Sequence, residues 1–169
     1  NLIERIIGIN AHLNIYSFED LIKKKEIELI ENDLDKNTYN EILYSIETQG
    51  LVISENISRG VAIRSYEKLN PKHYLYEKII SNKISSISFD QIIIGDSLAK
   101  ELNLKIGEQI KIAIPKTDKS LLGQIPRFKT LKVVGIFDFG MYEYDSSLVF
   151  ISLELARKLL LIEDNIYNR

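Results

Sequence analysis

Residues 111–135, KIAIPKTDKSLLGQIPRFKTLKVVG, decide how this chain folds. Isoleucines alternate with other residues from position 110 to 114, and this period of two predicts a half-buried strand. After the second proline, residues 130–137 predict another, more deeply buried strand. Proline has no amide proton to donate to a sheet, so Pro115 and Pro126 should end the two strands.

The insert between these prolines, residues 115–126, is too long for a tight hairpin turn. We therefore expect it to project, and we call it the hook. Its apolar residues are Leu121, Leu122 and Ile125, grouped around Gly123, and the basic residues of its stem are Lys116, Lys119, Arg127 and Lys129 against one acid, Asp118. An exposed apolar tip on a basic stem is typical of a docking feature. The alternative is that the insert folds back and buries its leucines.

Composition limits the classes of function. The chain has 169 residues, of which 45% are hydrophobic, so it can bury the core of one domain or of two small subdomains. A net charge of −2 argues against a general nucleic-acid binder, which usually carries a basic excess. With no cysteine, the chain has no disulfide, thiolate nucleophile or cysteine zinc site. His12 and His73 lack partner spacing and are interpreted as structural, so no metal or cofactor is expected.

The ends of the chain indicate a piece of a larger protein. The sequence opens without an initiator methionine or a signal peptide, and no apolar run approaches the length of a membrane span. We expect any targeting signal to lie outside it.

Hydrophobic periodicity predicts the other elements. We expect a helix across 18–34 that starts at Ser17, although residues 26–29 alternate and could form a strand instead. We also expect a β-meander across 39–64 with turns near Gly50 and Asn56, and a short helix across 74–80.

The later part of the chain predicts a strand at 91–94, a turn at Gly95 and a helix across 97–102 capped by Asp96. A strand at 148–151 should follow, with Ser152 capping a helix across 153–161. Gly107 is expected to have a positive φ.

Two stretches invite a catalytic or nucleotide-binding interpretation. Gly95 precedes a helix start, as in phosphate-binding loops, but the further glycines and the Lys-Ser/Thr pair of a P-loop are missing. Glu143 and Asp145 resemble a carboxylate pair, yet no nucleophile or basic partner lies near them in sequence. We interpret this stretch as a solvated acidic loop. No catalytic residues are identified, and the chain is not expected to be an enzyme.

A series of motifs in a fixed order resembles one family. The motifs are GINAHLNIYS (8–17), QGLVIS (49–54), RGVAIR (59–64), IIGDSLAKELNLKIGEQIKIAIP (93–115), LLGQIPR (121–127) and LKVVGIFDFGMYEYDSSLVFISLELARKLL (131–160). They resemble the periplasmic domain of the LolC/LolE family, the membrane subunits of the lipoprotein-releasing ABC transporter, which belong to a wider group with the MacB-type efflux proteins. The hook combined with the loop at 140–150 is similar to hybrid, LolF-type subunits.

This resemblance implies a fold. It is the α+β, MacB-like periplasmic core with two subdomains. The first would hold residues 1–66 and be completed by residues 162–169 and by residues beyond the chain. The second, inserted and β-rich, would span residues 67–161 and carry the hook.

The resemblance also implies a function in the periplasm, on a bacterial inner membrane protein. The hook would recruit the lipoprotein carrier LolA, with an apolar tip residue at Leu122. Basic residues at its base, Lys111, Arg127 and Lys129, would form a pad, although Phe128 stands where well-known members have a polar residue. Further partners would be lipoprotein cargo, a second membrane subunit and the ATPase subunit LolD, which would hydrolyse ATP in the cytoplasm. The alternatives are a MacB-like efflux or mechanotransmission subunit, which should lack the insert, a small-barrel enzyme, and a non-catalytic periplasmic spacer.

Overall fold

The structure is a computed structural model. It describes residues 3, 13–15, 21–35, 37, 42–55, 57–69, 74–80, 84–114, 126–164 and 166–169. Within these ranges no helix has the length and apolar character needed to cross a membrane.

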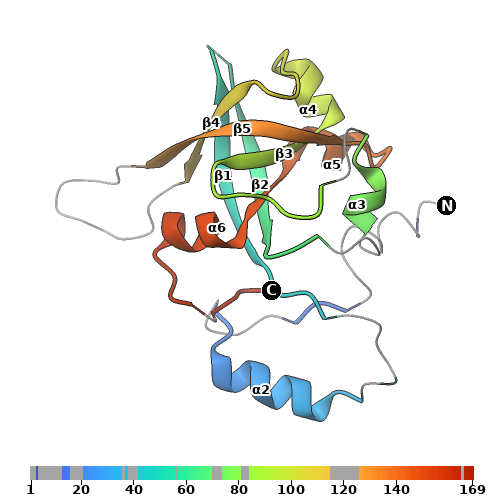
Figure 1. Cartoon of the computed structure of the whole chain (residues 1–169), viewed down its shortest axis with the longest axis vertical. Helices are drawn as coiled ribbons and strands as arrows, with labels where there is room; N and C mark the ends of the chain where they lie inside the picture. Colours follow the sequence, from blue (N-terminus) through green and yellow to red (C-terminus); the bar gives the residue numbers. More distant parts are fainter. Residues whose placement is uncertain are drawn as a thin grey trace.

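The strands of the described residues close into a barrel (Figure 1). They are β1 (Ile46–Ser54), β2 (Ile57–Tyr66), β3 (Gln91–Gly95), β4 (Gln109–Ile114), β5 (Arg127–Phe137) and β6 (Leu148–Ser152), in the spatial order β1-β2-β6-β3-β5-β4. The pairs β2–β6 and β3–β5 are parallel, and the other pairs are antiparallel. Closure removes the exposed strand edges that invite aggregation.

The helices of the described residues are α2 (Lys24–Asp33), α3 (Tyr74–Lys78), α4 (Asp96–Glu101), α5 (Tyr142–Ser147) and α6 (Leu153–Leu160). The last four pack around the barrel and at its ends, whereas α2 buries no residue and lies apart from it in Figure 1. In Figure 1, α6 lies beside the barrel close to the ends of β4 and β5, whereas α4 and α5 lie toward the opposite end. The mixture of helices and strands confirms the predicted α+β class.

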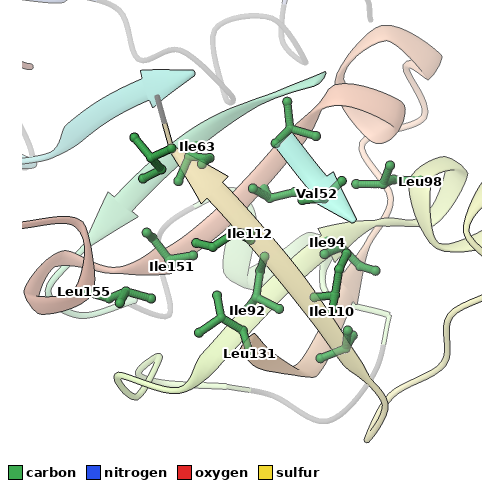
Figure 2. Packing of buried hydrophobic residues seen from close by; sticks show 14 of the residues in the cluster. Val52, Ile63, Ile92, Ile94, Leu98, Ile110, Ile112, Leu131, Ile151 and Leu155 are labelled. Carbon is green, nitrogen blue, oxygen red and sulfur yellow. The ribbon is translucent and has the colours of Figure 1, made fainter. Parts of the chain in front are cut away.

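The main core fills the barrel. Inward side chains from every strand meet there with those of α4 and α6, and Val52, Ile92, Ile112 and Val149 are completely buried. Figure 2 shows isoleucines of β2, β3, β4 and β6 converging on this interior. A second cluster lies outside the barrel between its wall and α3, and its aromatic residues include Phe137 and Phe150. Because β6 has core on both faces, all its residues are buried, and residues 148–151 form a continuous apolar run.

Gly50 lies within strand β1. The β-meander with a turn at this position is therefore wrong: one hairpin, β1–β2, takes its place. A Cβ on Gly50 would lie 2.6 Å from the carbonyl oxygen of Ala113, so the glycine permits the close approach of β1 to β4.

The predicted boundary between residues 66 and 67 divides this barrel. Strands β1 and β2, on one side of it, pair with β4 and β6 on the other side. The structure therefore groups residues 46–66 with the later strands, since a barrel closes only when each strand has two neighbours. The organisation into two subdomains itself stays a prediction.

The acidic stretch at 139–145 is not the solvated loop that the sequence predicted. Residues Tyr142–Ser147 form α5, and the side chain of Asp145 is buried. Its carboxylate accepts hydrogen bonds from the backbone amides of Phe139 (2.9 Å) and Met141 (3.0 Å), and so orders the turn that precedes the helix. Burial raises the pKa of the Asp145 carboxyl above its usual value, while the two amides act in the opposite direction.

Two other local predictions, a cap at Ser152 and a positive φ at Gly107, are confirmed, whereas the cap predicted at Asp96 is wrong because Asp96 is the first residue of α4 and Gly95 precedes it at the cap position. The hydroxyl of Ser152 accepts from the amide of Leu155 at 3.2 Å and caps α6 as expected. Gly107 has a φ of 96°. Helix α2 is shorter than predicted, and the start expected for it at Ser17 lies outside the described residues, as do both histidines.

Candidate docking surface at the base of the β4–β5 hairpin

Strands β4 and β5 form an antiparallel hairpin that ends where the two prolines predicted. Its pairing runs from Gln109 opposite Lys132 to Ile114 opposite Arg127. Pro126, the residue before β5, is exposed. The other residues predicted for the hook tip lie outside the described residues: Pro115, Leu121, Leu122, Gly123 and Ile125. The structure thus places both strand ends from which the hook departs.

The outer face of the hairpin carries Lys111, one of the predicted pad residues. It is exposed and pairs with Thr130. The next outward position along β5 is Phe128, which is 53% exposed. Phe128 pairs with Ala113, and Ala113 pairs in turn with Leu51 of β1, which is 45% exposed. Paired residues project to the same side of a sheet, so these three form a row across three strands, the outer row.

The other two predicted pad residues lie on the opposite side of β5. Arg127 and Lys129 pair with Ile114 and Ile112, whose side chains belong to the barrel core. Arg127 donates a hydrogen bond to the backbone carbonyl of Leu159 near the C-terminus of α6. That carbonyl is one of those a helix leaves unsatisfied at its end, so Arg127 ties the hairpin to α6.

Lys129 shares an aromatic ring with a lysine of α6. The ammonium nitrogen of Lys129 lies 4.8 Å from the centre of the Phe89 ring, and that of Lys158 lies 5.1 Å from it. Both distances are within the range of cation–π attraction. We call Arg127, Lys129, Lys158 and Phe89 the cationic cluster.

The predicted pad is therefore divided by the pleat of β5. Arg127 and Lys129 are brought together with α6, whereas Lys111 projects from the outer face. Sequence reasoning missed Leu51, Phe89 and Lys158. Phe89 and Lys158 are far from the hairpin in sequence, and only the strand order of the barrel brings them to it.

Charged side chains also gather elsewhere. On the surface, Glu101 accepts hydrogen bonds from Arg59 (2.9 Å) and from the Tyr142 hydroxyl (2.8 Å), and these bonds lower the pKa of its carboxyl. Near the C-terminus, Glu47 bridges Arg64 and Arg169, whose side chains are nearly buried. Both clusters join separate segments of the fold. In the described part of the chain, no three His, Cys, Asp or Glu side chains gather as metal ligands would.

Comparison with known proteins points to one family. No family model matches the chain. It is 27% identical over 126 residues to the lipoprotein-releasing system transmembrane protein LolC of Neisseria meningitidis, covering 72% of this chain and 30% of that protein. It is 30% identical over 134 residues to the LolC protein of Buchnera aphidicola subsp. Schizaphis graminum, covering 78% of the chain and 31% of that protein. The chain thus spans about a third of the length of these relatives.

A solved structure shares the fold. The extracellular domain of YknZ, a noncanonic ABC-type transporter from Gram-positive bacteria, matches with a TM-score of 0.53 at 12% identity. The match covers 90% of this chain and 76% of that domain. The sequence matches and the shared fold agree: over most of its length the chain is similar to the LolC proteins of the lipoprotein-releasing system, and its fold is that of an ABC transporter extracellular domain.

Proposed function

We propose that this chain is the periplasmic domain of an inner-membrane subunit of a lipoprotein-releasing ABC transporter, and that its hook recruits the carrier LolA. The observation that carries the proposal is the β4–β5 hairpin in a chain similar to LolC. Its pairing stops at Ile114 and Arg127, directly beside the two prolines, so a rigid barrel holds both ends of the insert.

Rigid anchoring favours this role. The barrel core includes side chains of both strands, Ile110, Ile112, Ile114, Leu131 and Val133, so the position of the strand ends is fixed before a partner arrives. A preorganised base lowers the ordering cost of binding, which otherwise reduces affinity.

Apolar burial would provide most of the affinity. Leu121, Leu122 and Ile125 would bury apolar surface in the mouth of the lipid-binding cavity of the carrier, at about 25 cal/mol per Å². Lipoprotein cargo would then pass from the transporter to the carrier.

The basic residues at the base of the hook would govern how fast the chain and the carrier associate. Lys111 on the outer face, with Arg127 and Lys129 on the opposite face of the hairpin, would attract an acidic surface and raise the association rate more than the affinity. ATP would be hydrolysed by a cytoplasmic subunit such as LolD, working with a second membrane subunit, so no catalytic step is assigned to this chain.

Substitution of Leu122 by aspartate tests the proposal. A charge at the tip would have to be desolvated in an apolar cavity, so L122D should weaken binding to LolA in a pull-down while the melting temperature of the chain stays unchanged. Undiminished capture by the folded variant would contradict carrier recruitment through the hook.

A second candidate is the extracellular domain of an ABC transporter with a different cargo, such as a MacB-like efflux or mechanotransmission subunit. The fold shared with YknZ favours it, because that protein is described only as a noncanonic ABC-type transporter. This candidate predicts no binding of LolA, so the same pull-down with the unmodified chain separates the two.

A further inference from the structure

We propose that Lys158 of α6, together with Lys129, binds an acidic segment of the carrier, extending the docking surface from the hairpin to the helix beside it. This inference rests on the proposed function, because it names a further part of the same docking site.

The first observation is that two lysines contact the same aromatic ring. Lys129 and Lys158 come from different elements, yet both ammonium groups lie over Phe89. They are therefore within about 10 Å of each other, roughly the Debye length at 0.1 M salt, so each feels the repulsion of the other. An anionic group beside them would relieve that repulsion.

The second observation concerns the charges around them. Among the residues that the structure describes, no carboxylate forms an ion pair with Lys129 or Lys158. Glu154 is one turn before Lys158 on α6, a spacing that often gives an ion pair, but the two do not pair here. The chain as a whole has a net charge of −2, so this group of cations is a local feature.

The third observation is the position of the cluster. Arg127, the first residue of β5, donates to the Leu159 carbonyl and so holds α6 against the strand end from which the hook departs. A partner that contacts this strand end would therefore lie close to Lys129 and Lys158. Because Arg127 is engaged by α6, the two lysines are the members of the cluster left to meet the partner.

An acidic protein segment fits these groups better than a membrane surface does. Basic clusters that bind anionic lipid typically contain about four to eight lysines or arginines. The cationic cluster offers two lysines on a partly buried ring, which suits one or two carboxylates held in place.

The test uses stopped-flow association of the chain with purified LolA. At low salt, Lys158→Gln should slow association roughly three-fold, with Lys129→Gln acting similarly, and the loss should disappear at about 1 M salt because charges are then screened. Lys158→Arg keeps the charge and should restore the rate. Lys105→Gln is the matched control, since Lys105 is exposed on the turn after α4 and should leave the rate unchanged.

The outcomes distinguish the two proposals. If the unmodified chain binds LolA and K158Q behaves like K105Q, the role of Lys158 is refuted while carrier recruitment stands. If the unmodified chain does not bind LolA, both proposals fail. Sedimentation with vesicles of phosphatidylethanolamine and phosphatidylglycerol gives a third readout. Loss of vesicle binding by K158Q, with the LolA rate unchanged, would assign the cluster to the membrane and overturn the inference.

Discussion

Ile114 and Arg127 are the last pair of the β4–β5 hairpin, and their side chains point toward the same side of the sheet but have different environments. Ile114 is buried in the barrel core, whereas Arg127 reaches the end of α6 and donates to the Leu159 carbonyl. This pair fixes the hook at both ends and sets which face of the hairpin each neighbouring lysine occupies.

Replacing Gly95 by alanine should destabilise the barrel. A Cβ at this position would lie 2.1 Å from the backbone oxygen of Asp145, an atom that cannot move without displacing α5. We expect a loss of about 3 kcal/mol in the free energy of unfolding, measured by urea denaturation.

Gly60→Ala is the matched control, because nothing lies within 4 Å of a Cβ there. Its effect should stay within about 0.5 kcal/mol. Equal stability of the two variants would contradict the packing of α5 on β3.

Replacing Leu161 by glycine should stabilise the chain. Leu161 ends α6 with a φ of 57°, in the left-handed region, and its side chain is 68% exposed, so little burial offsets the strain. Glycine accepts this conformation readily, and we expect the free energy of unfolding to rise by about 0.5–1 kcal/mol, as measured by thermal denaturation. Leu161→Ala keeps a Cβ and should bring no gain. If alanine raised the free energy of unfolding as much as glycine does, the backbone at this position would not be strained.

The sequence predicted those parts of the molecule that depend on neighbours along the chain. The prolines marked the ends of β4 and β5, and Ser152 marked the start of α6. Asp145 was misjudged because its partners are the amides of a turn, which hydrophobic periodicity does not reveal. Gly50 was taken for a turn because the need for a small residue arises only where β4 crosses close to β1.

The candidate docking surface could likewise be predicted only in part from the sequence. Lys111 and Lys129 both flank the hook in sequence, and only the hairpin register separates them onto opposite faces. Phe89 and Lys158 join the site through the closed strand order, which no local pattern encodes.

Alkaline pH should destabilise the chain through Tyr66. Burial raises the pKa of its hydroxyl above the ordinary 10.0, although Arg64 and Arg169 act against this. The folded chain therefore holds the proton more tightly than the unfolded chain does. Above pH 10, unfolding releases it, so the free energy of unfolding falls as the pH rises. Tyr66→Phe should make the stability decline less steeply in this range, as measured by urea denaturation at several pH values. The same slope in both proteins would contradict the assignment.

Reversing the charge of Lys111 should slow encounter with LolA at low salt. Lys111 is exposed on the outer face, where K111E would repel an acidic partner without disturbing the core. We expect a reduction in the association rate of roughly five-fold, diminishing as salt is added. Lys105→Glu makes the same charge change on the turn after α4 and should have little effect. If both variants slow association equally, the effect belongs to net charge, and Lys111 has no local role.

We propose that the insert between Pro115 and Pro126 recruits the carrier. The most direct test is titration calorimetry of LolA with the unmodified chain and with a variant in which a short Gly-Ser turn replaces residues 116–125. Because the core is formed by the barrel strands, the variant should keep its melting temperature. We expect the unmodified chain to bind LolA and this binding to disappear in the variant. Equal binding by both proteins, or none by the folded unmodified chain, would contradict the proposal.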